Sequence, residues 1–428
     1  MKINVFWFRR DLRLNDNTAL MEALSASLPV LPVFIFDTNI IEDLPIGDAR
    51  ISFIHESLAA INHNLREFES SIYVAKGEPQ KVWDEIITRF DIDTVFVNRD
   101  YEPYAVKRDD AIKNTLELRG IKMRSFKDQV IFEEKEVVKP NGTPYTVFTP
   151  YRNRWLKKYQ ELSIPASQAF NRNNYYKEIF PFPPLHDIGF ESAAVRVKPY
   201  DLSVIPAYHK FRDIPSQDRT THLGPHLRFG TVSIREMAAL GLRQNSVFLD
   251  ELIWREFFMQ LLWAFPHVVN YNFRKKYDGI AWRNDEKEFG KWCKGETGYP
   301  MVDAGMRQLN RTGFMHNRVR MIAASFLCKH LLTDWRWGEA YFAEKLHDYE
   351  LSSNNGNWQW TAGTGVDASQ YFRIFNPSFQ QKKFDPKNIY VKTWVEDYGK
   401  STYPEPIVDH NFARERVIAA YRNAAGEQ

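Results

Sequence analysis

Several features that mark specialised proteins are scarce in this sequence. The 428-residue chain has two cysteines, Cys293 and Cys328, too few for a disulfide framework, so we expect a reducing cytosol. No apolar run reaches the roughly 18 residues that a membrane helix needs, and the apolar start meets Arg9 too early for a signal peptide. His222 and His226 are four residues apart but have no acidic or cysteine partners, so we predict no metal site.

Two sequence fingerprints are also missing. No G-x-G-x-x-G follows the first expected strand, which argues against the standard dinucleotide site there. No G-x-S-x-G is present, which argues against a serine hydrolase. The 57 basic and 54 acidic residues nearly cancel, so any affinity for nucleic acid must come from local clusters of Arg and Lys.

Aromatic residues, by contrast, are plentiful at 15% of the chain, and nine of the 12 tryptophans follow residue 200. Because a helical core can be built from aliphatic residues alone, this bias hints at ring stacking or ring chemistry in the C-terminal half.

The first 130 residues alternate strand-like and helix-like segments. The strand-like runs are Ile3–Phe8, Val30–Phe36, Ile72–Ala75 and Thr94–Val97. Residues 51–68, 79–90 and 105–119 between them carry apolar residues at helical spacing. This alternation predicts an α/β domain with a doubly wound, mostly parallel, five-stranded Rossmann-like sheet.

The residue pattern then changes twice, after residue 130 and after residue 198. Residues 131–198 are broken by proline and glycine, with one convincing helix near residues 151–162, and are predicted to form an interdomain linker. Residues 199–428 lose the β-alternation and are predicted to form an all-α domain. Its expected helices span residues 233–242, 250–264, 299–310, 317–332 and 338–346.

Three segments of the helical domain contain residues that are candidates for a functional site. In DELIWREFF, a helix puts Glu251, Trp254, Arg255 and Phe258 on one face, although a solvated Glu–Arg pair explains this equally well. In MHNRVRM, Asn317 and Met321 share a face, but methionine is also a common core filler. The third segment, HDYELSSNNGNWQW (347–360), is rich in turn formers and predicts a compact functional loop.

Taken together, these segments resemble the photolyase/cryptochrome family, with motifs closest to the bacterial class I cyclobutane pyrimidine dimer photolyases. The resemblance rests on WFRRDLRLNDN (7–17), TGYPMVDAGMRQLNRTGFMHNRVRM (297–321), DWRWGEAYF (334–342) and NNGNWQWTAGTGVDASQYFRIFNP (354–377). It implies an α/β antenna domain, a wrapping linker and a helical FAD domain. The implied activity is light-driven repair, in which the reduced, anionic flavin donates an electron that splits the dimer.

The resemblance also assigns a cofactor site. The residues that would hold FAD are Tyr208, Thr220, Thr221, His222, Leu223, Gly224, Phe248, Glu251, Arg255, Asn317, Arg320, Asp348, Tyr349, Glu350 and Asn354. The run Thr220–Gly224 departs from the usual TSxLS pattern, and the Glu350 position is more often Asp. Asn354 would face flavin N5, where an amide can accept or donate but cannot act as a titratable acid. This favours the reduced flavin of a repair enzyme.

The same resemblance implies catalytic, relay and DNA residues. Glu251 and Asn354 would act at the reacting centre, and Trp358, Trp335 and Trp282 would relay electrons. The lesion and the DNA would contact Arg212, Trp254, Arg255, Phe258, Asn317, Arg318, Met321, Trp360, Arg373, Gln380 and Lys383. Indoles can stack on a flipped dimer, and the cations can hold phosphates without regard to sequence.

Alternatives within and beyond the family remain. A cryptochrome light sensor usually carries a long C-terminal tail, but only residues 378–428 follow Pro377. A (6-4) photolyase would need histidines where Asn317 and Met321 stand. A module that only binds RNA or single strands would need neither Asn354 nor the tryptophans.

The expected partner is UV-damaged DNA, with no membrane and no obligate protein partner. We expect a cytoplasmic monomer that joins the nucleoid when bound to DNA. The resemblance allows a second chromophore, an antenna pigment, but does not identify it. Ala105 and Asn270 stand where folate-using relatives place Glu and Lys, which disfavours folate.

Overall fold

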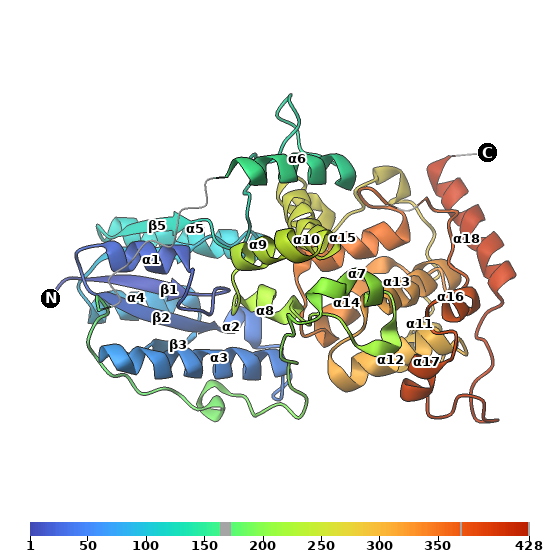
Figure 1. Ribbon diagram of the computed structural model, residues 1–428, viewed down its shortest axis with the longest axis horizontal. Coiled ribbons are helices and arrows are strands. Elements are labelled where there is room, and N and C mark those ends of the chain that lie inside the picture. The colour runs from blue at the N-terminus through green and yellow to red at the C-terminus, as the bar shows by residue number, and fades with distance from the viewer. Residues whose placement is uncertain (163–172, 369, 427–428) are drawn as a thin grey trace. The chain divides into compact units, whose positions relative to one another are not determined.

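The computed structural model describes residues 1–162, 173–368 and 370–426 (Figure 1). The chain divides into two compact units, each built from three segments of the sequence. The first unit comprises Met1–Glu133, Lys158–Pro199 and Leu223–Leu240, and the second comprises Glu134–Lys157, Tyr200–His222 and Gly241–Gln428. No helix in these described ranges is long and apolar enough to cross a membrane.

The first unit contains a parallel sheet of five strands in the order β3-β2-β1-β4-β5. The strands are β1 (Ile3–Phe8), β2 (Val30–Asp37), β3 (Tyr73–Gly77), β4 (Ile92–Asn98) and β5 (Lys122–Phe126). The chain moves outward from β1 in one direction and then in the other, so the sheet is doubly wound, with its switch point between β1 and β4. The predicted fold class is confirmed.

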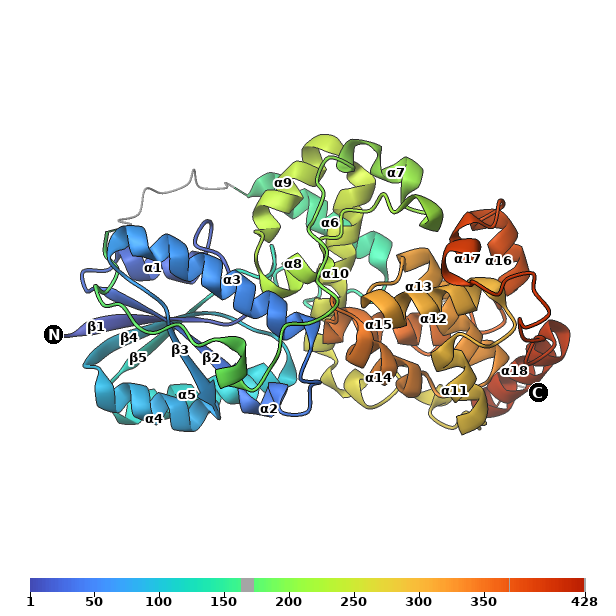
Figure 2. The same ribbon diagram turned by 90° about the horizontal axis from the view of Figure 1, so that it is seen from below.

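Helices cover both faces of this sheet (Figure 2). The unit's helical elements are α1 (Thr18–Ser25), α2 (Thr38–Ile41), α3 (Ala49–Leu65), η1 (Arg66–Phe68), α4 (Pro79–Arg89), α5 (Pro103–Leu118), η2 (Leu185–Ile188) and α8 (Gly224–Phe229). Alternate residues of β1 serve opposite faces: Phe6 and Phe8 pack with α1 and α3, and Val5 and Trp7 pack with α4 and α5. This alternation follows from the two-residue period of a strand.

Strand β5 was the strand that the sequence pattern did not locate. Its residues, KMRSF, are mostly exposed or half-buried, and it lies at the edge of the sheet beside β4 alone. Charged side chains are typical of edge strands, because they discourage pairing with another chain, and they remove the apolar run that identifies a buried strand.

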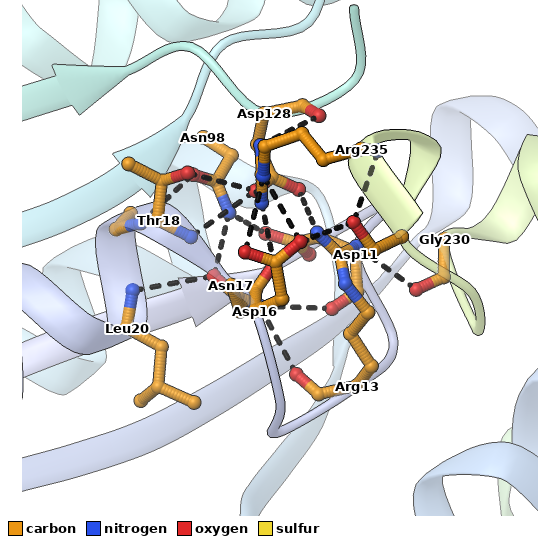
Figure 3. Close-up of polar contacts among 12 residues, drawn as sticks. Asp11, Arg13, Asp16, Asn17, Thr18, Leu20, Asn98, Asp128, Gly230 and Arg235 are labelled. Carbon is orange, nitrogen blue, oxygen red and sulfur yellow. Dashed lines mark hydrogen bonds and ion pairs between the residues drawn. The ribbon is translucent and has the colours of Figure 1, made fainter. Parts of the chain in front are cut away.

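A buried ionic network joins four elements of the first unit (Figure 3). Asp128, which follows β5, is 1% exposed. Its carboxylate accepts hydrogen bonds from Arg13 at 2.6 Å, from Arg235 of helix α9 (Ile234–Gln244) at 2.8 Å and from the backbone N–H of Thr18 at 3.1 Å. Burial raises the pKa of Asp128, but the two guanidinium groups outweigh it and lower the pKa below its ordinary value.

We predict that Asp128→Asn lowers the free energy of unfolding by about 3–5 kcal/mol, because two guanidinium groups lose a buried carboxylate partner. Chemical denaturation measures this loss. Asp93→Asn is the matched control, since Asp93 pairs with Lys2 at the surface, and we expect its cost to stay below about 1 kcal/mol. Equal effects of the two substitutions would show that the network does not stabilise the unit.

The second unit is helical, as predicted. Helix α6 (Phe148–Glu161) begins in it and ends in the first unit, and α9 does the reverse. The other helical elements are η3 (Ile205–Ala207), α7 (Tyr208–Phe211), η4 (Pro215–Gln217), α10 (Ser246–Ala264), η5 (Pro266–Val269), η6 (Lys275–Tyr277), α11 (Glu286–Lys294), α12 (Pro300–Thr312), α13 (Asn317–Ser325), η7 (Phe326–His330), α14 (Trp335–Lys345), α15 (Leu351–Ala362), α16 (Pro377–Phe384), α17 (Ile389–Trp394) and α18 (His410–Ala425).

The prediction of a loop over residues 347–360 was wrong, because most of this segment is helix α15. Two of its polar residues, Asn355 and Gln359, are buried hydrogen-bond donors rather than turn formers. The side-chain amides of Asn355 and Gln359 both donate to the carbonyl of Val268, at 3.0 and 2.9 Å. Packing and these hydrogen bonds therefore override the low helix propensity of Ser, Asn and Gly.

The predicted helix over residues 317–332 changes its winding partway along. It runs as α13 and continues as one π-helical turn, η7. A π-helical turn widens the helix locally and occurs often beside functional sites. Here it carries the fully buried side chains of Cys328 and Lys329 into the core of the second unit.

Candidate functional site

Helix α15 supplies side chains to two adjoining cavities in the second unit. Residues 350, 353, 354, 357, 358 and 361 line the first cavity, of about 100 Å³. They follow one another at intervals of three and one, so they lie on one helix face. Residues 353, 357 and 360 line the second cavity, of about 320 Å³. Asn317, Met321, Ser353 and Asn357 line both cavities and form their common wall.

The first cavity brings together most of the predicted cofactor residues of the C-terminal motifs. These are Asn317, Arg320, Asp348, Tyr349, Glu350 and Asn354. Apolar side chains complete the wall, among them Met321, Phe342 and Trp358. A cavity that combines apolar walls with a few convergent polar groups is typical of a cofactor site.

Two bidentate ion pairs fix the acidic groups of the site. Arg320 donates to Asp348 at 3.1 and 2.9 Å. Arg255 donates to Glu350 at 3.0 and 3.3 Å, and both side chains are nearly buried. Glu350 lines the first cavity and Arg255 the second, so this pair connects them. Each carboxylate already has an arginine partner before a ligand binds. The two ion pairs therefore need not rearrange when a ligand enters the cavities.

The amide of Asn354 has a fixed orientation. Its Nδ2 donates to the backbone carbonyl of Glu339 at 3.0 Å and to the Glu339 carboxylate at 2.8 Å. These bonds use both amide hydrogens. A flip would turn the amide oxygen toward the backbone carbonyl of Glu339, which can only accept a hydrogen bond. The amide therefore has a single orientation. Only the carbonyl oxygen of Asn354 remains to meet a ligand in the first cavity. Burial raises the pKa of Glu339, and the hydrogen bond from Asn354 opposes this rise.

The second cavity contains the predicted lesion residues. Arg212, Glu251, Trp254, Arg255, Phe258, Asn317, Arg318, Met321 and Trp360 line it. Glu251 accepts from Arg212 at 2.5 Å. Burial raises the pKa of Glu251, although the charge of Arg212 acts in the opposite direction. Glu251 lines this cavity and not the first, so its expected contact with the cofactor is the less direct one.

The two indoles of this cavity differ in what they offer. The ring of Trp254 is stacked on Phe148, with centroids 3.6 Å apart and planes 5° apart, so one of its faces is already covered. Among the described residues, no aromatic ring packs on Trp360, which is half-buried. No aromatic ring of the described chain therefore competes with an incoming base for the faces of Trp360.

Other predicted residues do not line these two cavities. Tyr208 packs edge-on against the buried Phe248, with centroids 5.7 Å apart, and burial raises the pKa of Tyr208. The run expected to hold phosphates is divided: Thr220, Thr221 and His222 belong to the second unit, and Leu223 and Gly224 to the first. The first cavity thus brings the predicted C-terminal cofactor residues together, whereas the run predicted to hold phosphates does not line it.

The remaining DNA residues and the relay residues Trp335 and Trp282 lie elsewhere in the second unit, whereas the relay residue Trp358 lines the first cavity. Arg373 and Lys383 are exposed, and Gln380 is half-buried on α16. Trp335 and Trp358 lie in one apolar cluster, and Trp282 packs against it. The nearest rings to Trp358 are Phe342 at 5.0 Å and Trp292 at 6.2 Å.

The sequence analysis missed three polar residues of the site. Ser353 and Asn357 line both cavities, and Glu339 orients Asn354. The four-residue spacing of Ser353 and Asn357 would have identified them, had the segment been read as a helix. No sequence signal indicates Glu339, because it meets Asn354 through the packing of α14 on α15.

Comparison with known proteins agrees with this architecture. Residues 4–170 match the family model for DNA photolyase, and residues 248–400 match that for the FAD binding domain of DNA photolyase. A deoxyribodipyrimidine photo-lyase of Agrobacterium fabrum is 38% identical over 97% of this chain and 97% of its own length. The crystal structure of a class III photolyase from Agrobacterium tumefaciens has a TM-score of 0.87 at 35% identity, covering 99% of this chain and 98% of the other. An archaeal photolyase from Sulfolobus tokodaii, solved with two FAD molecules, has a TM-score of 0.84 at 35% identity, covering 99% of this chain and all of the other.

A doubly wound α/β unit and a helical unit with paired cavities define a two-part cofactor-binding protein. Its motifs, its fold and its full-length relatives show that the chain belongs to the DNA photolyase family. FAD is the cofactor of this family's helical domain, and the first cavity suits its ring system. Apolar walls can face the ring, and the free carbonyl of Asn354 can accept a hydrogen bond from its edge.

We predict that Gly338→Ala disturbs the first cavity. A Cβ at Gly338 of α14 would lie 2.1 Å from the Trp358 ring and 2.6 Å from Leu327, so the ring must move or the helices must separate. We expect a loss of about 1–3 kcal/mol in unfolding free energy and weaker FAD uptake on reconstitution. Gly290→Ala in α11 is the matched control, because open space surrounds that position and alanine favours the helix. Unchanged FAD uptake in Gly338→Ala would contradict the assignment of this cavity.

Proposed function

We propose that this chain is a light-driven DNA repair enzyme, a deoxyribodipyrimidine photo-lyase that splits cyclobutane pyrimidine dimers. The observation that carries this proposal is the wall shared by the two cavities. Asn317, Met321, Ser353 and Asn357 line both, so a flavin in the first cavity and a dimer in the second would touch the same side chains. Close approach of donor and acceptor is what electron transfer requires.

Bound reduced FAD would supply the photoexcited electron, and the protein supplies position and electrostatics. The fixed orientation of Asn354 supports the reduced state. Reduced flavin carries a hydrogen on N5, and Asn354 can offer only its carbonyl oxygen in that direction. A hydrogen bond to the reduced form favours that form.

The second cavity would hold the extruded dimer. A base inside a duplex must be flipped out to reach an enzyme's reactive centre, and a damaged pair costs less to extrude. Trp360 offers a free ring for stacking, and Glu251 offers a polar edge beside Arg212. Because burial raises the pKa of Glu251, its protonated form persists to higher pH and could donate a hydrogen bond to the charge that develops on the dimer.

Binding to UV-damaged DNA would rest on cations that line the lesion cavity and on cations that do not. We assign phosphate contacts to Arg212 and Arg318 of the cavity lining, and to Arg373 and Lys383, with Gln380. Arg318 already pairs with Asp213 at 2.7 Å, so Arg373 and Lys383, which are exposed, would gain most from DNA. We further propose a cytoplasmic monomer with no obligate protein partner, and size-exclusion chromatography with light scattering tests the monomer.

Repair itself is tested with the purified protein loaded with reduced FAD. The protein is illuminated with oligothymidylate that contains cyclobutane dimers, and thymine absorbance is followed. We expect the absorbance to recover in the light and not in the dark. Flavin loading without recovery would contradict repair and indicate a sensor, and recovery with (6-4) photoproducts alone would contradict the substrate. The absorption spectrum of the same sample reveals any second pigment.

We predict that Trp360→Ala and Arg373→Ala weaken DNA binding in different ways. Trp360→Ala should lower the affinity for dimer-containing DNA by about 1–3 kcal/mol and leave undamaged DNA unaffected, because it removes a stacking surface. Arg373→Ala should weaken both DNAs equally and reduce the salt slope by about 1. Titrations at several salt concentrations measure both. A parallel loss for damaged and undamaged DNA in Trp360→Ala would contradict the lesion cavity.

We predict that Glu339→Leu makes reduction of the bound flavin less favourable. Without its carboxylate, Asn354 loses one of the two acceptors that fix its amide. If the Asn354 bond to N5 weakens by about 0.7–1.4 kcal/mol, the two-electron midpoint potential falls by roughly 15–30 mV. Glu339→Gln keeps a side-chain acceptor and should stay close to wild type. Spectroelectrochemistry measures the potentials, and an unchanged value in Glu339→Leu would show that Glu339 does not orient Asn354.

A further inference from the structure

One exposed aromatic side chain of the second unit lies among cations. Phe379 of α16 is 62% exposed, more than any other Phe, Tyr or Trp in the described part of the chain. Its backbone N–H donates to the side chain of Asn376, the N-cap residue of α16, at 3.1 Å. The ring therefore projects from the capped first turn of a helix. Isolated apolar side chains are common on protein surfaces, so exposure alone assigns no role.

The side of α16 that carries Phe379 also carries two lysines. Lys382 and Lys383 follow Phe379 by three and four residues, which places all three on one side of the helix. Both lysines are exposed, and among the described residues neither forms an ion pair with a carboxylate. Asp385, the nearest acidic residue in the sequence, is buried and accepts a hydrogen bond from the backbone N–H of Val391 at 2.9 Å. This side of α16 therefore combines an exposed aromatic ring with positive charge that no described carboxylate neutralises.

Helix α16 also adjoins the second cavity. The guanidinium carbon of Arg318, which lines that cavity, lies 4.4 Å from the ring centroid of Phe384. Because a helix turns about 100° per residue, four residues follow one another around α16 at steps of about 40–60°: Phe384, Gln380, Lys383 and Phe379. Exposure increases along this band, since its first two residues are half-buried and its last two are exposed. The band therefore leads from the lining of the second cavity to the surface.

We propose that Phe379 is a stacking side chain for an unpaired base, in a nucleotide that flanks the lesion on the same DNA strand. The band on α16 is then a second contact for the strand whose dimer enters the cavity. This inference rests on the proposed function and deepens it, because single-stranded DNA that contains a dimer is the substrate that gains most from α16.

The chemistry of the band fits single-stranded DNA. Every base has an aromatic face that stacks on a side-chain ring irrespective of sequence, and cations hold the phosphates between the bases. In a duplex both faces of a base are covered by its neighbours in the stack, so a ring on the protein surface meets only sugars and phosphates. Phe379 thus distinguishes an unpaired strand from a duplex, whereas Lys382 and Lys383 bind the phosphates of both.

Dark titrations of the FAD-loaded protein test the proposal, with fluorescence anisotropy as the readout. The probes are dimer-containing oligothymidylate alone and the same strand annealed to oligodeoxyadenylate. Phe379→Ala should weaken binding to the single strand at least about fivefold, the lower end of the effect of one lost stacking contact. Binding to the duplex should stay close to the wild-type value, because the bases that flank the lesion are paired.

Two further variants of the same position separate stacking from a general apolar contact. Phe379→Leu keeps an apolar side chain but has no ring, and it should lose affinity for the single strand as Phe379→Ala does. Phe379→Trp keeps a ring and should bind the single strand at least as tightly as wild type. Full single-strand affinity in Phe379→Ala or in Phe379→Leu would overturn the proposal. Equal losses for the single strand and the duplex would overturn the assignment to an unpaired base.

Phe412→Ala is the matched control. Phe412 of α18 is 58% exposed and its ring centroid lies 5.2 Å from the guanidinium carbon of Arg416, so it too is an exposed ring beside a cation. Helix α18 packs against η6 and η7, which do not line the second cavity. All DNA affinities of Phe412→Ala should match wild type, and a loss of single-strand affinity equal to that of Phe379→Ala would overturn the specific role of α16.

Salt dependence separates stacking from charge. Lys382→Ala should reduce the slope of log affinity against log salt concentration for the single strand by about 0.7, because one phosphate contact is lost. Phe379→Ala should leave this slope unchanged, since the ring releases no counterions. A reduced slope in Phe379→Ala would show that the substitution acts through the lysines and would overturn the role of the ring.

The same titrations distinguish failure of this inference from failure of the proposed function. Phe379→Ala should weaken binding to damaged and undamaged single strands alike, whereas Trp360→Ala affects damaged DNA alone. Equal wild-type binding to damaged and undamaged strands would contradict the lesion cavity of the proposed function, and a loss of single-strand affinity in Phe379→Ala would still support this inference. A wild-type preference for damaged strands, together with full single-strand affinity in Phe379→Ala, would overturn this inference and keep the proposed function.

Discussion

The close packing of α15 against α10 and α14 is the constraint on which the site depends. Two glycines make it possible, since a Cβ at Gly356 would lie 2.1 Å from Phe258 of α10, and one at Gly338 would lie 2.1 Å from Trp358. With the helices this close, one face of α15 reaches the first cavity and the adjacent face reaches the second. The common wall of the cavities is therefore a direct result of the helix spacing, and donor and acceptor sites share it for that reason.

The same packing explains why polar residues are tolerated in the middle of the unit. Asn355 and Gln359 of α15 are buried but satisfied by the carbonyl of Val268, and Asn354 is satisfied by Glu339. A buried amide without a partner would cost about 1–3 kcal/mol. Because every one of these amides is fixed by its partner, the group that each presents to a ligand is decided before the ligand arrives. Such preorganisation lowers the cost of reorganising the site during electron transfer.

The sequence predicted the elements that have a strong period and failed where packing decides. Ile3–Phe8 is a fully buried apolar strand and was found at its observed bounds, whereas the charged edge strand β5 was not located. For α15, turn-forming residues indicated a loop, because propensity does not reveal that Val268 and Phe258 lie alongside. That single error concealed Ser353 and Asn357, whose helical spacing becomes visible only once the segment is a helix. Glu339 could not be assigned from local sequence, since its role comes from its contact with Asn354.

Three cations of the second unit differ in the groups that they face, and the difference decides whether their charge can change. Arg255 and Arg320 each face a carboxylate in a bidentate pair, and an arginine keeps its charge at any physiological pH. Their charge states are fixed, which suits groups that hold a cofactor or shape a cavity. Lys329 faces a carbonyl and a ring instead, so neither of these partners compensates the full cost of burying an ammonium. Burial lowers the pKa of Lys329 to about 7, so its charge can change near neutral pH. The groups with fixed charge therefore line the cavities, whereas Lys329 lines neither of them.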